Sequence, residues 1–200
     1  MSDFMKGIPD MGKVERRLEE LERRREALLS LSRELIRLAG KAITLMHARR
    51  LAEAAALLAR MRRLERRLKA GEKGMEYFSQ QAHQEYVEAI AFYTVLKERR
   101  LVSPAESGSG EVPYLLGVMD LVGELKREII DAIRAREYAL ADEYYALMKG
   151  IYDSTRHFRF ANSVVPDFRR KQDTARIQLE SAAGELLAAG AGKAELQRLK

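Results

Sequence analysis

Apolar residues recur at helical spacing along almost the whole chain. From Val14 to Leu45 they return every three or four positions, and charged residues fill the opposite faces. This pattern predicts a first helix that follows Pro9-Asp10 and runs to about His47. The same spacing predicts five further helices, at about 51–69, 75–100, 113–136, 138–158 and 167–189. Because no alternating strand pattern is found, we expect an all-α, single-domain bundle of about six to seven helices over residues 1–200.

One internal segment and the two ends lack this pattern. Residues 101–113 contain Ser103-Pro104 and the run Ser107-Gly-Ser-Gly110, which are typical of turns. We therefore expect a flexible loop at 101–113. Residues 1–10 and 190–200 are expected to be tails. No apolar stretch is long enough for a signal peptide or a membrane span, so the expected protein is cytoplasmic and has no membrane partner.

Charge narrows the choice of partner. The net charge is +6, and Lys and Arg outnumber Asp and Glu about two to one between residues 12 and 70. A polyanion, nucleic acid first, is the partner that such a surface favours. The candidate phosphate contacts in this region are Arg24, Arg25, Arg49 and Arg50. The alternative is a solvated face on which these arginines pair with neighbouring glutamates. The absence of cysteine excludes disulfides and thiolate metal sites.

Four acidic residues interrupt apolar helix faces. Glu85 and Glu88 are three positions apart, so they share one face of the third predicted helix. Asp120 is the only charged residue between Val112 and Gly123, and Glu124 lies one turn further on. Because buried charges need a partner, a divalent cation could hold the four together, and oxygen ligands favour Mg²⁺ or Mn²⁺. The alternative is that each acid is solvated or paired with an arginine.

The sequence also resembles a known family. The matching strings are Leu45-Met-His47, Gln84-Glu-Tyr-Val-Glu-Ala89 and Tyr114-Leu-Leu-Gly-Val-Met-Asp-Leu-Val-Gly-Glu-Leu125. They are similar to the translin family, specifically its translin-associated factor X (TRAX) branch. The resemblance implies a seven-helix subunit that assembles into a hollow octamer around single-stranded RNA. It also implies Mg²⁺-dependent endoribonuclease activity.

Site residues follow from this resemblance by position. Glu85, Glu88 and Asp120 match the catalytic acids, and Glu124 is a further metal-linked candidate. Lys41 stands near a basic residue of the family's site, which suggests a phosphate contact. Because this one chain could supply both shell and chemistry, a homo-oligomer is expected. The alternative function is a non-catalytic, translin-type protein that binds single-stranded DNA or RNA.

Overall fold

The computed structural model describes residues 10–198, of which residues 191–198 are described as backbone only. The elements in chain order are α1 (Met11–His47), α2 (Leu51–Gly71), η2 (Glu76–Phe78), α3 (Gln80–Glu98), α4 (Pro104–Ser107), α5 (Glu111–Arg134), α6 (Tyr138–Thr155) and α7 (Phe168–Arg198). Within residues 10–198 there is no strand. The all-α prediction is therefore confirmed, and each of the six predicted helices corresponds to a long helix.

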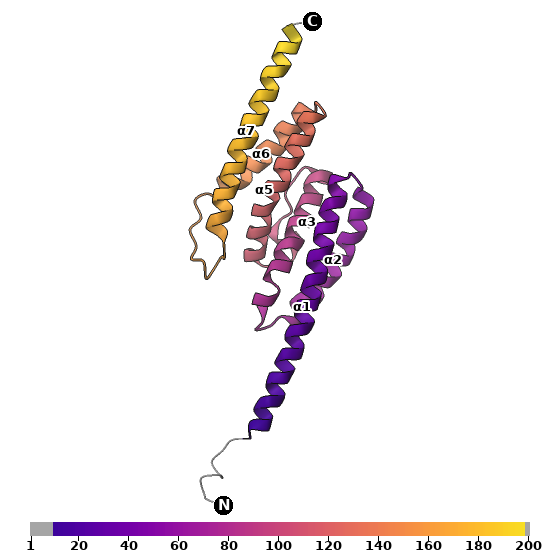
Figure 1. Cartoon of the computed structure of the whole chain (residues 1–200), viewed down its shortest axis with the longest axis vertical. Helices are drawn as coiled ribbons and strands as arrows, with labels where there is room; N and C mark the ends of the chain where they lie inside the picture. The colour runs from indigo at the N-terminus through magenta and orange to yellow at the C-terminus, as the bar shows by residue number, and fades with distance from the viewer. Residues whose placement is uncertain (1–9, 199–200) are drawn as a thin grey trace, which may run out of the picture.

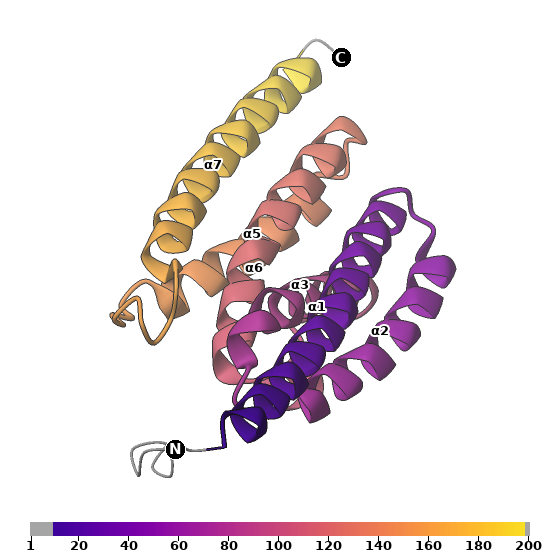
Figure 2. The same ribbon diagram turned by 60° about the horizontal axis from the view of Figure 1, so that its bottom comes forward.

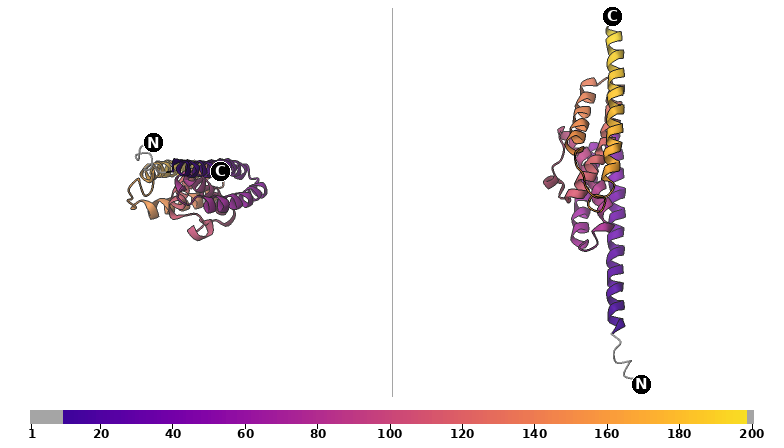
Figure 3. Two further views of the ribbon diagram at one scale, coloured as in Figure 1. Left: turned by 90° about the horizontal axis from the view of Figure 1, so that it is seen from below. Right: turned by 90° about the vertical axis from the view of Figure 1, so that its left-hand side faces the viewer.

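The helices pack side by side in an order that differs from the chain order. α1 lies between α2 and α3, α3 packs on α5, and α5 contacts both α6 and α7 (Figures 1 and 2). α1 and α7 run along one side of the molecule and project beyond it at opposite ends (Figure 3). The apolar stripe of α1 is buried from Leu28 onward, whereas Leu18 and Leu21 on the projecting half are exposed.

A glycine sets how closely α3 and α5 approach each other. A Cβ atom at Gly117 would lie 2.6 Å from the carbonyl oxygen of Gln84 and 2.8 Å from Cβ of Val87. No side chain larger than hydrogen fits there without a shift of the backbone. The close approach places the polar face of α3 directly opposite that of α5, and the candidate site lies between them.

The segment at residues 101–113 is more regular than the flexible loop that its breaker residues predicted. Ser103 caps the short α4, because its Oγ accepts a hydrogen bond from the Glu106 amide at 3.3 Å and Glu106 accepts one from the Ser103 amide at 2.7 Å. Arg100 binds both carboxylate oxygens of Glu106 at 2.8 and 2.9 Å. Proline in a first helical turn costs no hydrogen bond, so α5 begins at Glu111, before Pro113.

The two predicted tails have different outcomes. Residues 1–9 lie outside the described part of the chain, and Asp10 directly precedes α1. At the other end α7 continues to Arg198 and includes residues 190–198, which were expected to be a tail. Glycine lowers helix propensity only by about 1 kcal/mol, so the glycines near residue 190 do not end the helix.

Candidate functional site

The four predicted acids face one another across the contact between α3 and α5. Glu85 and Glu88 come from α3, and Asp120 and Glu124 come from α5. Burial raises the pKa of the Glu88 carboxyl to about 9, and the negative charges of the other three acids add to this effect. Glu88 therefore belongs to one electrostatic group with Glu85, Asp120 and Glu124, which we call the acid cluster.

Glu88 is the most enclosed member of the acid cluster. Its residue is 9% exposed, and none of the described side chains donates a hydrogen bond to it or pairs with it. Burial also raises the pKa of Glu85, and the charge of Asp120 contributes. Two neighbouring carboxyl groups thus resist ionisation because burial and the adjacent negative charges outweigh the charge of Lys171 and, for Glu85, a hydrogen bond with Gln81. This is the part of the site that most needs a cation.

Asp120 is already neutralised by another helix. Its two carboxylate oxygens accept hydrogen bonds from Nε2 of Gln84 on α3 and Nζ of Lys171 on α7. The side chain of Lys171 is 13% exposed, so its ammonium group is largely enclosed beside the acid cluster. No pattern in the sequence singles out Lys171. It belongs to the run Arg169-Arg-Lys171, and nothing in that run distinguishes the lysine that turns inward.

Glu124 belongs to a chain of charged groups that leads away from Glu88. Nε2 of His47 hydrogen-bonds to Glu124, and Nδ1 of His47 lies 3.0 Å from Oε1 of Glu128. Glu128 is completely buried, and its other oxygen accepts a hydrogen bond from Arg49 at 2.6 Å. Burial lowers the pKa of His47, but the hydrogen bonds to Glu124 and Glu128 outweigh it and raise that pKa to about 9. His47 therefore carries a positive charge at neutral pH.

The residues present offer oxygen ligands but do not form a closed metal cage. Within the described residues, the set of three side chains whose ligand atoms all lie within 4.8 Å of one another is His47, Glu128 and Asp131. Arg49 already occupies one oxygen of Glu128. The acid cluster forms no such set, yet it contains Glu88, a buried carboxyl without a partner. Its all-oxygen donors suit Mg²⁺ or Mn²⁺, so the composition of the acid cluster fits such an ion.

The predicted phosphate contacts on α1 and in the connection from α1 to α2 are mostly engaged. Arg25 pairs with Glu22 and Glu26 at 2.7 Å each, and Arg50 pairs with Glu53 at 2.6 Å.

Arg24 donates to the carbonyl oxygen of Lys73 at 3.2 Å, and Arg49 binds the buried Glu128. Lys41 is exposed on α1 near Glu53, whose pKa is lowered mainly by the hydrogen bond from Arg50, with a smaller contribution from the charge of Lys41. Of these five basic residues, the structure connects only Arg49 to the acid cluster, through Glu128 and His47.

The chain is similar to one protein family and to several solved structures. The sequence model of the Translin family matches residues 23–182. The crystal structure of AfC3PO has 30% sequence identity and a TM-score of 0.83, covering 91% of this chain and 97% of that chain. A structure of AfC3PO in complex with duplex RNA has 31% identity and a TM-score of 0.80 over the same shares. Apo-NeC3PO, at 21% identity, shares the fold with a TM-score of 0.83, covering 91% of this chain and 98% of that chain.

A curated relative also matches. Protein MJ0175 of Methanocaldococcus jannaschii, which is uncharacterized, is 33% identical over 105 residues, which are 52% of this chain and 47% of that protein. The chain thus matches about half the length of this curated relative. In the part of the chain that the structure describes, no helix is both long enough and apolar enough to cross a membrane.

Proposed function

The chain belongs to the translin family, and from this premise we propose that it is a Mg²⁺-dependent endoribonuclease of the TRAX type that acts on single-stranded RNA within a homo-oligomeric shell. Two kinds of support bear on the RNA. The similar AfC3PO is described in complex with duplex RNA. The basic first two helices of this chain supply positive charge of the kind that attracts a polyanion.

The observation that carries the proposal is Glu88. A carboxyl that is buried, unpartnered and surrounded by three other acids is costly to a protein unless a cation accompanies it. Glu85, Glu88 and Asp120 would hold the ion, and Glu124 is close enough to act on the same charge. A bound Mg²⁺ would supply Lewis-acid polarisation of a phosphate and would lower the pKa of a water molecule.

The protein's own groups have separate tasks. Gln84 fixes the orientation of the Asp120 carboxylate through its amide. The ammonium group of Lys171 donates a hydrogen bond to Asp120. It can donate instead to a phosphate oxygen of the substrate, because both acceptors are anionic. Glu85 is the candidate general base. It is half-buried beside the other acids, where its carboxylate can accept a proton from a water molecule.

Cleavage of a labelled single-stranded RNA tests the enzyme. We expect Mg²⁺ or Mn²⁺ to support cleavage and EDTA to abolish it. Glu88→Gln and Asp120→Asn should remove cleavage and leave RNA binding in EDTA unchanged. The matched control is Glu143→Gln, which changes an exposed carboxylate on α6. Cleavage at the parent rate by either acid-cluster variant would contradict the proposal.

A second candidate is a non-catalytic protein that binds single-stranded DNA or RNA, as in translin. The engaged Asp120, which Lys171 neutralises without a metal, is the observation that favours it. In that case RNA is bound but remains intact in both Mg²⁺ and Mn²⁺.

The shell is tested separately. Light scattering after gel filtration should give about 180 kDa for eight chains of 22.8 kDa.

A further inference from the structure

The connection between α6 and α7 concentrates basic and aromatic side chains. Residues 156–171 contain five Lys or Arg, three Phe and a single acidic residue, Asp167. Six of these side chains form what we call the α6–α7 patch: Arg156, Phe158, Arg159, Phe160, Arg169 and Arg170. Five of them are exposed and Phe158 is partly exposed. Neither the predicted phosphate contacts nor the acid cluster includes any of them.

The aromatic part of the patch packs on the buried ring of Phe168. Phe168 is 3% exposed, and its ring centroid lies 6.3 Å from that of Phe158 and 6.0 Å from that of Phe160. Phe158 and Phe160 are 5.7 Å apart. Phe160 nevertheless remains 50% exposed. A large apolar ring is thus fixed by a buried neighbour and presents one side to solvent, as a platform for stacking does.

Two of the four arginines around this ring, Arg159 and Arg169, retain an uncompensated charge, whereas Arg156 pairs with Asp153 at 3.7 Å and Arg170 pairs with Asp167 at 3.6 Å. Nη1 of Arg159 donates to the carbonyl oxygens of Arg156 and Phe158 at 2.8 and 2.7 Å, which fixes the guanidinium group without neutralising it. Arg169 makes no hydrogen bond or ion pair with any described side chain. Neither arginine has a carboxylate partner among the described residues, in contrast to Arg25 on α1 and Arg50 just before α2. Free guanidinium groups attract phosphates most strongly.

The patch lines a cavity at the start of α7. About 220 Å³ of space lies between Phe158, Phe160, Arg159, Arg169 and Gln172, roughly the volume of seven water molecules. Gln172 fastens the connection to α7 by donating to the carbonyl oxygen of Thr155 at 2.8 Å.

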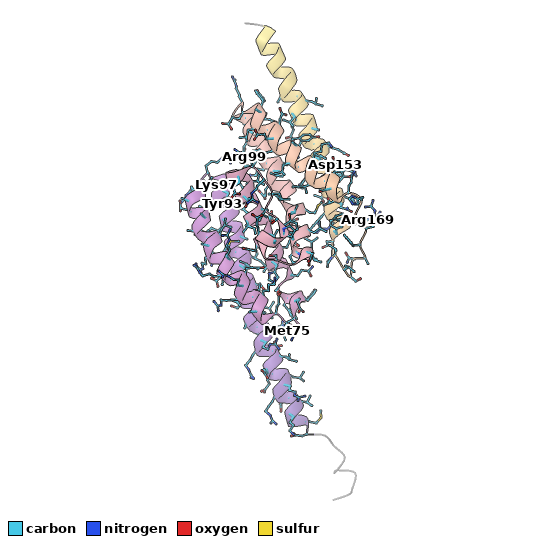
Figure 4. The ribbon with its side chains drawn as sticks, turned by 180° about the vertical axis from the view of Figure 1, so that it is seen from behind. Met75, Tyr93, Lys97, Arg99, Asp153 and Arg169 are labelled. Carbon is cyan, nitrogen blue, oxygen red and sulfur yellow. The ribbon has the colours of Figure 1, made fainter. Side chains whose placement is uncertain are left out.

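The preceding residue in the chain, Lys171, binds Asp120. The cavity and the acid cluster therefore both border the first turns of α7, the cavity through Gln172 and the acid cluster through Lys171. Figure 4 shows Arg169 at the outer edge of the molecule, at the start of α7.

We propose that the α6–α7 patch is a binding site for single-stranded RNA that leads the strand to the acid cluster. An unpaired base stacks on Phe160, and Arg159 and Arg169 bind the phosphates on either side of it. The inference rests on the proposed function only in taking RNA as the substrate. Stacking and charge act on any base, so the site is insensitive to sequence. Duplex RNA keeps its bases paired and stacked, so it cannot use Phe160 in this way.

Binding of a fluorescein-labelled oligouridine to the full chain in EDTA tests the site without cleavage. Arg159→Ala combined with Arg169→Ala should weaken binding at least ten-fold. It should also make the salt dependence shallower by about 1.4, since each lost phosphate contact on a single strand removes about 0.7 from the slope of log K against log salt. Arg169→Ala alone should give half that change in slope. Because Arg169 has no partner among the described side chains, this variant leaves the fold intact.

Phe160→Ala tests the stacking of a base on the aromatic ring. It should weaken binding roughly 5- to 150-fold without changing the slope of log K against log salt. Phe160→Trp should restore it. Two matched controls should bind like the parent. Arg134→Ala with Arg176→Ala removes two exposed positive charges outside the patch, and Tyr77→Ala removes an aromatic side chain that is 84% exposed.

The outcomes separate this inference from the proposed function. If the parent binds and cleaves RNA while the patch variants behave like the controls, the inference fails and the proposed function stands. If the patch variants lose binding of single strands and the parent fails to cleave RNA with either Mg²⁺ or Mn²⁺, the inference stands and the endoribonuclease proposal fails. Equal losses for duplex RNA, or binding of the parent only to anionic lipid vesicles, would overturn the inference.

Discussion

Replacing Glu88 by glutamine should stabilise the metal-free protein. The carboxyl is 9% exposed and lies against three other acids, and its pKa is raised to about 9. The ordinary value for a glutamate is 4.5. Between these two values the folded chain holds a proton that the unfolded chain has released. The stability of the parent therefore falls as pH rises from about 4.5 toward 9, because the unfolded state binds fewer protons.

The size of the effect follows from the two pKa values. In the unfolded chain the carboxyl ionises above pH 4.5, which is about 2.5 units below pH 7. Each unit is worth about 1.4 kcal/mol, so at pH 7 the buried carboxyl lowers the free energy of unfolding by about 3 kcal/mol. A glutamine amide has nearly the shape of the protonated carboxyl and does not ionise. Glu88→Gln should therefore be more stable than the parent by about 3 kcal/mol at pH 7. For a chain of 200 residues this raises Tm by roughly 6–12 °C.

Thermal unfolding at a fixed protein concentration, in EDTA and from pH 5 to pH 9, measures this difference. The gap between Glu88→Gln and the parent should be small at pH 5 and widen steadily to pH 9, whereas Glu143→Gln should follow the parent. Added Mg²⁺ should then stabilise the parent more than the variant, because an ion that binds only the folded state adds RT ln(1 + [L]/Kd). Equal Tm values for variant and parent at pH 8 would refute the reasoning.

Three further predictions concern other residues. Gly117→Ala should destabilise the fold by about 1–3 kcal/mol, because the new Cβ would lie 2.6 Å from a backbone oxygen. Gly150→Ala, with nothing within 4 Å of its Cβ, should stabilise the fold by up to about 1 kcal/mol. Urea unfolding measures both, and a change of the same sign for the two variants would contradict this. The pKa of His47 is raised to about 9, so His47→Gln should lower the free energy of unfolding by about 3 kcal/mol at pH 6 and by little at pH 9.5. An equal loss of stability at both pH values in thermal melts would exclude this. Lys171→Met frees an oxygen of Asp120 and should raise Mn²⁺ affinity about ten-fold; titration calorimetry showing unchanged affinity would count against it.

The long helices could be predicted from the sequence because their signal is local. Each apolar stripe repeats every three or four residues and needs no knowledge of the rest of the fold. The acids Glu85 and Asp120 could be singled out for the same reason, since each interrupts such a stripe. The error at residues 101–113 was also local. Ser103 and Pro104 were interpreted as breakers, but they are equally favourable at a helix start, and Glu106 completes the cap.

The partners of charged side chains could not be predicted in this way. Arg25 and Arg50 carry the charge that suggested phosphate contacts, yet neighbouring glutamates neutralise both. No sequence pattern singles out Arg159 and Arg169, although they keep their charge uncompensated beside an exposed ring. A count of basic residues does not distinguish these cases, because an ion pair depends on where the side chains meet.

The sequence by itself determined that this protein is a helical bundle of the translin family with acids on the faces of two of its helices. Only the tertiary structure decided which acid remains without a partner. Lys171 reaches Asp120 across 51 residues of chain, and His47 reaches Glu124 across 77. Helical periodicity acts over a few residues, whereas the ionisation of a carboxyl depends on every charge within several ångströms, whichever part of the chain supplies it.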